Sequence, residues 1–266
     1  MAHIRLKASK EQVVKFNPIA LNAIDLPAES KEYVKKYLGS KKLAEDDEMD
    51  IMLLLSDRIV FGFDYLDDKV KRVVVEINPV TIFFSNAVMC SRQLKYYKDL
   101  LLSQAPDVKE LGRNREGVNQ NHSGMYFQLA INCIINLQAA LESFANRVIP
   151  NDYIFIGSDG KEQVSSITLK LYNAIPKIRN SKFRPPKYKK YNAQIDSLIK
   201  LRNHIIHLKP NGLTNTGYKG VYRDLLDFDY HKAIESVRVF INFYEENLIE
   251  ECPCGDNFSF FVGQDK

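Results

Sequence analysis

The chain has 266 residues, of which 45% are hydrophobic and 26% are charged, and its formal net charge at pH 7 is +4. These fractions are typical of folded globular proteins, so they exclude a mainly disordered, collagen-like or coiled-coil chain. With 12 glycines and 10 prolines, the chain has few of the residues on which turn-rich β proteins depend. A net charge of +4 does not by itself indicate a nucleic-acid partner. The positions of the basic residues therefore matter more than their number.

The sequence predicts neither a secretion signal nor a membrane span. No long apolar run of the kind found in signal peptides follows Met1–Leu6. The most apolar stretches are Ile51–Leu55 and Ile131–Leu141, and two asparagines and a glutamine interrupt the second. Neither approaches the roughly 20 apolar residues that a membrane-spanning helix needs. We therefore expect no membrane association and a cytoplasmic location.

Cysteine usage points to a reducing compartment. The four cysteines are Cys90, Cys133, Cys252 and Cys254, and the first two lie in apolar segments. Such cysteines are typical of buried free thiols. The last two form a Cys-Pro-Cys motif without the second pair that a structural zinc site requires. We expect no metal there.

The N-terminal part predicts a small α+β element. Two short runs rich in Val, Ile and Phe, Arg58–Tyr65 and Val70–Ile77, flank a polar four-residue turn. This pattern predicts a β-hairpin. Three further segments complete the element, namely a strand at Ile51–Leu55, a helix at Ser30–Leu38 and a solvated acidic loop at Glu45–Asp50.

From Thr81 onward the hydrophobic period becomes helical. Helices are predicted at Phe84–Ser103, His122–Ile149, Gln163–Ala174, Lys187–Leu208 and Phe228–Ile249, with a polar loop at Gly112–Asn121. The second of these helices is apolar nearly all round, as the central helix of a bundle would be. The predicted fold is mainly α, with an α+β element over 1–80, a helical bundle over 81–250 and a tail over 251–266.

One arginine interrupts the apolar face of the predicted helix Lys187–Leu208. With Ile195 at the origin and about 100° per residue, the leucines and isoleucines fill one arc and Arg202 falls inside it, at about 340°. Three polar side chains follow on the flank at about 80°, 120° and 180°, namely Asn203, His207 and His204. One interpretation is structural: Arg202 snorkels or pairs with an acid, and His207 is a polar residue near a helix C-terminus.

The segment Leu201-Arg202-Asn203-His204-Ile205-Ile206-His207-Leu208-Lys209-Pro210 resembles the R-x4-H motif of the HEPN superfamily. In that motif a polar residue, typically Asn, follows the arginine, and the histidine lies near the end of a helix. The upstream stretch Leu137–Asn146 resembles the central helix of these proteins, and Ile167–Leu171 matches their short intervening helix in position. The resemblance covers residues 84–250 and assigns no role to 1–80.

The resemblance implies an HEPN-like helical bundle that forms a homodimer, with two R-x4-H motifs facing one cleft. It also implies a metal-independent endoribonuclease without a cofactor, acting as a toxin or antiphage defence effector. An antitoxin or a small nucleotidyltransferase would be its protein partner. Other members keep the fold without catalysis. A non-catalytic module that binds RNA, nucleotides or proteins is therefore the alternative function.

The residue types suit RNA cleavage. Cleavage without a metal uses the 2′-hydroxyl as nucleophile and needs a group that moves protons near neutral pH, which imidazole side chains do. His207 is the candidate for that role. A guanidinium binds phosphate oxygens through a planar fork and stabilises the charge of the transition state, which suits Arg202. Asn203 is a candidate to hold the imidazole or a phosphate oxygen. The expected products carry 2′,3′-cyclic phosphate ends.

Two further residues are candidates for supporting roles. His204 lies three positions before His207, but two histidines do not make a metal site. Glu142 is a candidate to pair with Arg202 or to polarise an imidazole. Its alternatives are support of Asn146 at i,i+4 and a surface ion pair.

A basic stretch leads into the motif helix, with no acidic residue between Glu162 and Asp196. Basic side chains beside aromatic ones hold phosphates and stack on unpaired bases. The predicted RNA-binding residues are Arg184, Lys187, Lys189 and Lys190, with Tyr188 as a stacking platform. Single-stranded RNA is the expected substrate. The alternative is an ordinary solvated face.

Overall fold

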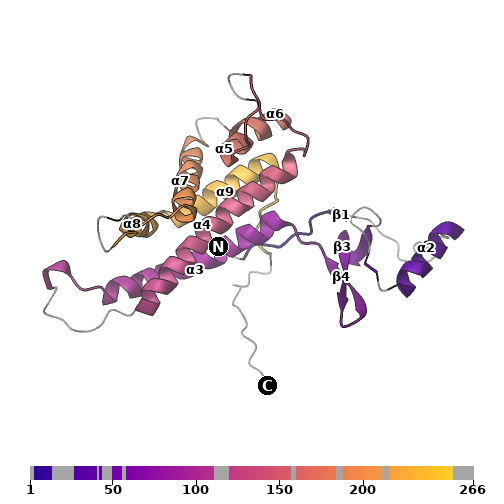
Figure 1. The fold of residues 1–266 in the computed structure, drawn as a ribbon, viewed down its shortest axis with the longest axis horizontal. Coiled ribbons are helices and arrows are strands. Elements are labelled where there is room, and N and C mark those ends of the chain that lie inside the picture. Colours follow the sequence, from indigo (N-terminus) through magenta and orange to yellow (C-terminus); the bar gives the residue numbers. More distant parts are fainter. Residues whose placement is uncertain are drawn as a thin grey trace. The chain divides into compact units, whose positions relative to one another are not determined.

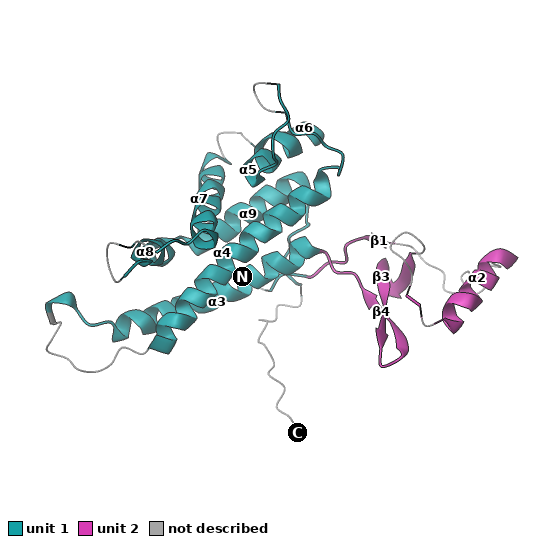
Figure 2. Cartoon of the chain, in the orientation of Figure 1, with its two compact units in different colours: residues 1–5, 79–266 teal, residues 6–78 magenta. Residues whose placement is uncertain are grey.

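The computed structural model describes residues 3–13, 27–40, 42–43, 50–55, 58–110, 120–156, 160–183, 188–210, 212 and 216–253. The chain divides into two compact units (Figure 2): a small one over residues 6–78, and a helical one over residues 1–5 and 79–266. The small unit contains an antiparallel sheet and the other consists of helices (Figure 1). The predicted fold class, mainly α with a small N-terminal sheet, is confirmed at this level.

The small unit is built on one antiparallel sheet in the order β1-β3-β2, with β4 also paired to β3. Its elements are β1 (Glu11–Val13), α2 (Ala28–Gly39), β2 (Ile51–Leu55), β3 (Arg58–Asp67) and β4 (Val70–Val75). The predicted hairpin, strand and helix are all present. Most of the predicted acidic loop, Glu45–Asp50, falls outside the described residues.

The two turn residues and one glycine determine the geometry of the β3–β4 hairpin. Asp68 and Lys69, the two residues between the strands, both have positive φ values, 43° and 68°. That pair of values is typical of a type I′ turn, whose twist matches that of the flanking strands. A Cβ at Gly62 would lie 2.4 Å from the carbonyl oxygen of Val74, across the ladder. Glycine therefore allows the two strands to approach closely there.

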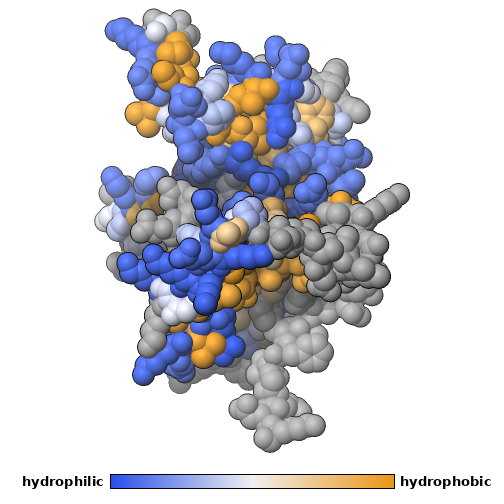
Figure 3. Space-filling view, turned by 90° about the vertical axis from the view of Figure 1, so that its right-hand side faces the viewer, coloured by the Kyte–Doolittle hydropathy of each residue, from blue (hydrophilic) through white to orange (hydrophobic). Residues whose placement is uncertain are grey.

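The strands of the small unit bury few large side chains. Among its described residues, Val60 is 2% exposed, whereas Phe63, Tyr65 and Val70 are about half exposed. On the face of the molecule that Figure 3 shows, hydrophobic side chains gather in small patches separated by hydrophilic ones. A small sheet with so little burial gains little stability from packing.

The helical unit places α4 at its centre. Its elements are α3 (Pro79–Gln104), η1 (Val108–Glu110), α4 (Gln120–Val148), α5 (Ile167–Leu169), η2 (Lys170–Ala174), α6 (Ile175–Ile178), α7 (Lys189–Ile206), α8 (Lys219–Asp227) and α9 (Tyr230–Tyr244). Helix α4 packs along α3 and also against α7 and α9 (Figure 1). By length and composition alone, α4 is apolar enough to cross a membrane. Leu137, Leu141 and Phe144 on this helix are completely buried in the unit, as expected of a central bundle helix.

The predicted helix Gln163–Ala174 has the wrong bounds. The helical segment starts only after Ser166, whose side chain accepts a hydrogen bond from the N–H of Leu169 at 3.3 Å. It then widens into the π turn η2 and continues through Pro176 as α6. Pro176 is the second residue of α6 and directly follows the π turn, where the regular hydrogen-bond ladder of an α-helix is already interrupted. Pro176 therefore does not end this segment, although the sequence pattern predicted that it would.

The predicted helix Phe228–Ile249 corresponds to α9 alone, and the helix before it, α8, was not predicted. Helix α9 starts after Asp229, whose carboxylate accepts a hydrogen bond from the N–H of Lys232 at 2.9 Å. This N-cap separates it from α8, which lies entirely upstream of the predicted start. Helix α9 also ends at Tyr244, earlier than predicted.

The first residues belong to the helical unit rather than to the predicted element 1–80. Ile4 is 1% exposed and forms a β-bridge with Glu251. The Arg5 guanidinium pairs with the Glu250 carboxylate at 3.0 Å, and the N–H of Cys252 donates to the His3 carbonyl at 2.7 Å. The structural division therefore falls at residues 6–78.

The cysteines of α3 and α4 are free thiols, as predicted. Cys133 is buried and Cys90 half-buried. Burial raises the pKa of both thiols, so the neutral form is favoured. Cys252 is also a free thiol, and Cys254 lies outside the described residues.

Candidate active site at the end of helix α7

Helix α7 forms because one of its faces is apolar at helical spacing. The buried residues of this face are Ile195, Leu198, Ile199, Leu201 and Ile205, and the helix packs against α4 and α9. The predicted core-facing side of this helix is therefore confirmed. The helix ends at Ile206, and the N–H of His207 donates to the Asn203 carbonyl at 3.1 Å. Pro210 follows shortly after, where a helix cannot easily continue.

Arg202 is half-buried on this same side of α7. Its Nη1 donates a hydrogen bond to Oδ1 of Asn203 at 3.4 Å. No carboxylate within the described ranges forms an ion pair with it. The acid-paired arginine of the structural interpretation is therefore not what the described residues show. A partly buried cation without an acidic partner lowers the stability of the folded chain. A bound anion would offset that loss.

The apolar face of α7 becomes exposed at its C-terminal end. Ile206 is 48% exposed, although helical spacing places it on the same side as Ile195 and Ile199. Arg202 lies one turn before it. The described part of this chain therefore leaves the end of this face partly uncovered.

Asn203 and His207 are both exposed. The His207 imidazole makes no hydrogen bond with any residue that the structure describes. Arg202 and His207 lie about 140° apart around the helix axis, and Asn203 lies between them. One chain thus presents the three motif side chains around the end of one helix, without joining the guanidinium to the imidazole.

His204 faces a different neighbour from the rest of the motif. Its Nδ1 lies 4.0 Å from Oδ2 of Asp224 on α8, and both side chains are more than half exposed. They belong to a shallow pocket of about 310 Å³ lined by Ser197, Lys200, Leu201, His204, Asp224, Asp227 and Phe228. This pairing was not predicted, because α8 was not among the predicted helices. The amphipathic pattern of Lys219–Asp227 was the signal that could have revealed it.

The described residues hold no group of three His, Cys, Asp or Glu side chains placed to bind a metal ion. His204 and His207 thus have no third ligand there.

Glu142 is half-buried on α4 and is not joined to the motif. Within the described ranges, it forms neither an ion pair nor a hydrogen bond with Arg202 or with an imidazole. Asn146, one turn further along α4, accepts a hydrogen bond from Nζ of Lys170 at 2.7 Å instead. The supporting role predicted for Glu142 stays a prediction.

The predicted RNA-binding residues are only partly described. Lys189 and Lys190 are exposed in the first turn of α7, whereas Arg184 and Lys187 lie outside the described residues. The Tyr188 ring stacks on Phe183, with the ring centroids 4.5 Å apart and the planes 11° from parallel. One face of the Tyr188 ring is thus packed on Phe183, and this contact helps to hold the start of α7 in place.

No family model, curated protein or solved structure matches this chain. The resemblance to the HEPN superfamily therefore depends on the motif and on its position among the helices.

Proposed function

We propose that this protein is a metal-independent endoribonuclease of the HEPN type. It cleaves single-stranded RNA and leaves 2′,3′-cyclic phosphate ends. The observation that carries the proposal is the setting of Arg202, a half-buried residue whose guanidinium has no acidic partner among the described residues. Asn203 lies beside it, and His207 is exposed where the helix ends. A phosphate group would be the negatively charged partner that this guanidinium lacks.

The proposed active form is a homodimer formed through the C-terminal end of α7. Ile206 is about half exposed there, on the side of α7 that is otherwise buried. A second copy placed on this end would cover Ile206 and bring two motifs to one cleft. It would also exclude water around Arg202, which strengthens charge interactions with a bound phosphate. The site would then be complete only in the dimer.

In the proposed reaction, the 2′-oxygen of a nucleotide attacks the adjacent phosphorus and the bond from phosphorus to the 5′-oxygen breaks. One imidazole accepts the proton of the 2′-hydroxyl, and a protonated imidazole donates a proton to the departing 5′-oxygen. The two copies of His207 supply these two groups. Arg202 stabilises the negative charge on the non-bridging phosphate oxygens. Asn203, which makes a long hydrogen bond with Arg202 at 3.4 Å, holds a phosphate oxygen or an imidazole.

Cleavage of a labelled single-stranded RNA in EDTA tests this proposal. We expect Arg202→Ala and His207→Ala to abolish cleavage, and a substrate with 2′-deoxy sugars to resist it. Matched controls are Arg223→Ala and His231→Ala, which remove exposed side chains of the same types from α8 and α9. Full activity of the Arg202→Ala, His207→Ala double variant would overturn the nuclease proposal.

A non-catalytic module that binds RNA or nucleotides is the second candidate. The observation that favours it is the His207 imidazole, which no described residue holds in place. Binding of RNA that depends on Arg202, without cleavage by wild-type dimer, would favour this candidate.

In the nuclease proposal, the protein acts as a toxin or an antiphage effector restrained by an antitoxin or a nucleotidyltransferase. Growth arrest on expression, lost in His207→Ala, tests that role.

A further inference from the structure

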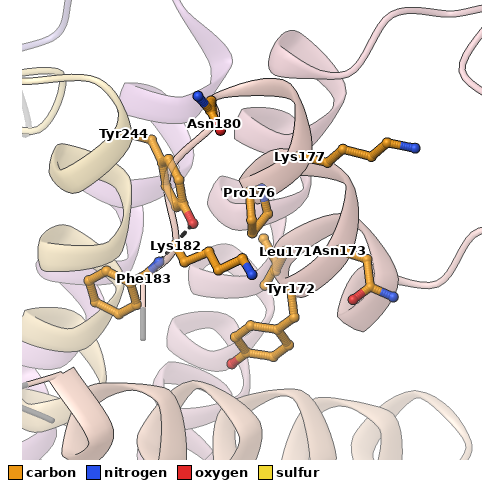
Figure 4. Close-up of a pocket in the computed structure, with 9 residues that line it drawn as sticks. All are labelled: Leu171, Tyr172, Asn173, Pro176, Lys177, Asn180, Lys182, Phe183 and Tyr244. Carbon is orange, nitrogen blue, oxygen red and sulfur yellow. Dashed lines mark hydrogen bonds between the residues drawn. The ribbon is translucent and has the colours of Figure 1, made fainter. Parts of the chain in front are cut away.

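A second candidate site lies outside the R-x4-H motif, and none of its lining residues belongs to α7. It is a pocket of about 490 Å³ formed by η2, α6, the turn that follows and the end of α9 (Figure 4). Its lining residues are Leu171, Tyr172, Asn173, Pro176, Lys177, Asn180, Lys182, Phe183 and Tyr244. This volume is within the usual range for small-molecule sites, roughly 300–1,000 Å³.

The charge on the lining is positive. Lys177 and Lys182 line the pocket and none of the lining side chains is a carboxylate. Neither lysine forms an ion pair with another residue in the described ranges. The Lys182 side chain reaches across the pocket toward Tyr172, and the Lys177 side chain extends outward at the rim (Figure 4). Such a lining favours an anion.

The backbone around the pocket holds Lys182 in this position. Asn180 adopts a left-handed conformation with φ of 46°, and the N–H of Ser181 donates to the Pro176 carbonyl at 3.1 Å. The chain therefore turns back after α6, and Lys182 comes to face η2. The other wall includes a π turn, a rare form of helix that occurs frequently at functional sites.

Aromatic and amide groups complete the lining. The Tyr244 hydroxyl accepts a hydrogen bond from the N–H of Phe183 at 3.2 Å, which fixes the wall opposite η2 (Figure 4). The Tyr172 hydroxyl donates to Asp196 at 2.9 Å, so this ring is also held in place. Asn173 and Asn180 add amide groups that donate and accept hydrogen bonds. Fixed rings, amides and cations together suit an organic anion better than a bare inorganic one.

We propose that this pocket binds a nucleoside monophosphate group, with its phosphate on Lys182, with Lys177 adding positive charge at the rim, and with its base or sugar against the aromatic and amide side chains. The ligand is either a free nucleotide or the 5′-terminal nucleotide of an RNA, because both present the same chemistry. The site is separate from the R-x4-H motif. Asp196, which holds Tyr172 of the pocket, lies six residues before Arg202, roughly 9 Å along the axis of α7. The proposal goes beyond the nuclease function and does not require it.

Calorimetric titration with AMP and with adenosine tests the pocket. We expect AMP to bind and adenosine to bind more weakly by roughly tenfold or more, since the phosphate contacts are charge-assisted. The Lys177→Gln, Lys182→Gln double variant should weaken AMP binding by a similar factor. Lys95→Gln is the matched control, because it removes an exposed lysine of α3 that does not line the pocket. Thermal unfolding of each variant verifies that the fold is intact.

A second comparison identifies the source of the ligand. It uses a short 2′-O-methyl RNA, which resists cleavage through the 2′-hydroxyl, with and without a 5′-phosphate. Binding of free AMP that depends on the two lysines supports a nucleotide site. Binding of only the 5′-phosphorylated RNA, with the same lysine dependence, supports an RNA-end site.

The proposal is overturned if AMP binds no better than adenosine and the 5′-phosphate adds nothing to RNA binding. It is also overturned if the double-lysine variant binds these probes as tightly as the wild type does. The Arg202→Ala variant distinguishes the two proposals, because it should lose cleavage and keep AMP binding.

Discussion

The guanidinium of Arg202 donates to the side chain of Asn203, the next residue along α7, at 3.4 Å. The long distance and the single bond describe a weak contact between neighbours on one helix. This contact does not neutralise the charge of the arginine. The remaining N–H donors of the guanidinium make no hydrogen bond within the described part of the chain, so they are available to a ligand or a second copy.

Arg202 should contribute little to the free energy of unfolding. Because this cation is half-buried without an acid, Arg202→Leu should leave the free energy of unfolding unchanged or raise it by about 0.5–1 kcal/mol, while RNA cleavage is lost. Urea unfolding and the cleavage assay measure the two quantities. Ile205→Ala is the contrast, since it removes a buried side chain of the same helix and should cost about 2–4 kcal/mol. Marked destabilisation by Arg202→Leu would instead indicate a structural arginine.

The second prediction concerns the N-terminal residues. Ile4 is 1% exposed and lies in the main hydrophobic cluster of the helical unit. Ile4→Ala should therefore lower the stability of that unit by about 2–4 kcal/mol. Thermal unfolding followed by helical circular dichroism measures this loss. Leu6→Ala is the control, because Leu6 is 46% exposed. An equal loss of stability in both variants would contradict the assignment of residues 1–5 to the helical unit.

The third prediction concerns the small unit at alkaline pH. The Tyr37 hydroxyl donates to the Asp64 carboxylate at 2.7 Å and joins α2 to β3. Burial, and then Asp64, raise the pKa of Tyr37 from 10.0 to about 12. The folded unit therefore holds this proton at pH values where the unfolded chain releases it. The resulting stability is fully present below pH 10 and is lost as the pH rises toward 12.

The Tyr37→Phe variant tests this linkage. It should lower the stability of the small unit by about 1 kcal/mol at neutral pH, because one hydrogen bond to Asp64 is lost. The difference from wild type should shrink as the pH rises from 10 to 12. Urea unfolding followed through NMR signals of the β3–β4 hairpin measures it. A difference that stays constant over this range would contradict the role given to the Tyr37 proton.

Local patterns predicted most elements of the fold. The two runs rich in Val, Ile and Phe on either side of the polar turn Leu66–Lys69 were sufficient to predict the hairpin, since strand and turn chemistry act between near neighbours. The period of α7 likewise placed Ile195, Leu198 and Ile205 in the core, and the structure confirms it. Two errors concern helix bounds and a helix that was not predicted. Pro176 did not end its helix, and α8, which ends before the Asp229 N-cap of α9, was not predicted.

The sequence by itself determined which side chains lie on each face of α7, because the helical repeat depends only on residue spacing. It therefore identified Arg202 as a charge on an apolar face. Only the tertiary structure decided that Ile206 stays exposed and that His204 faces Asp224. It also decided that residues 1–5 join the helical unit and that Lys182 lies over a pocket. These features depend on which distant segments come together in the folded chain, and spacing along the sequence does not encode that.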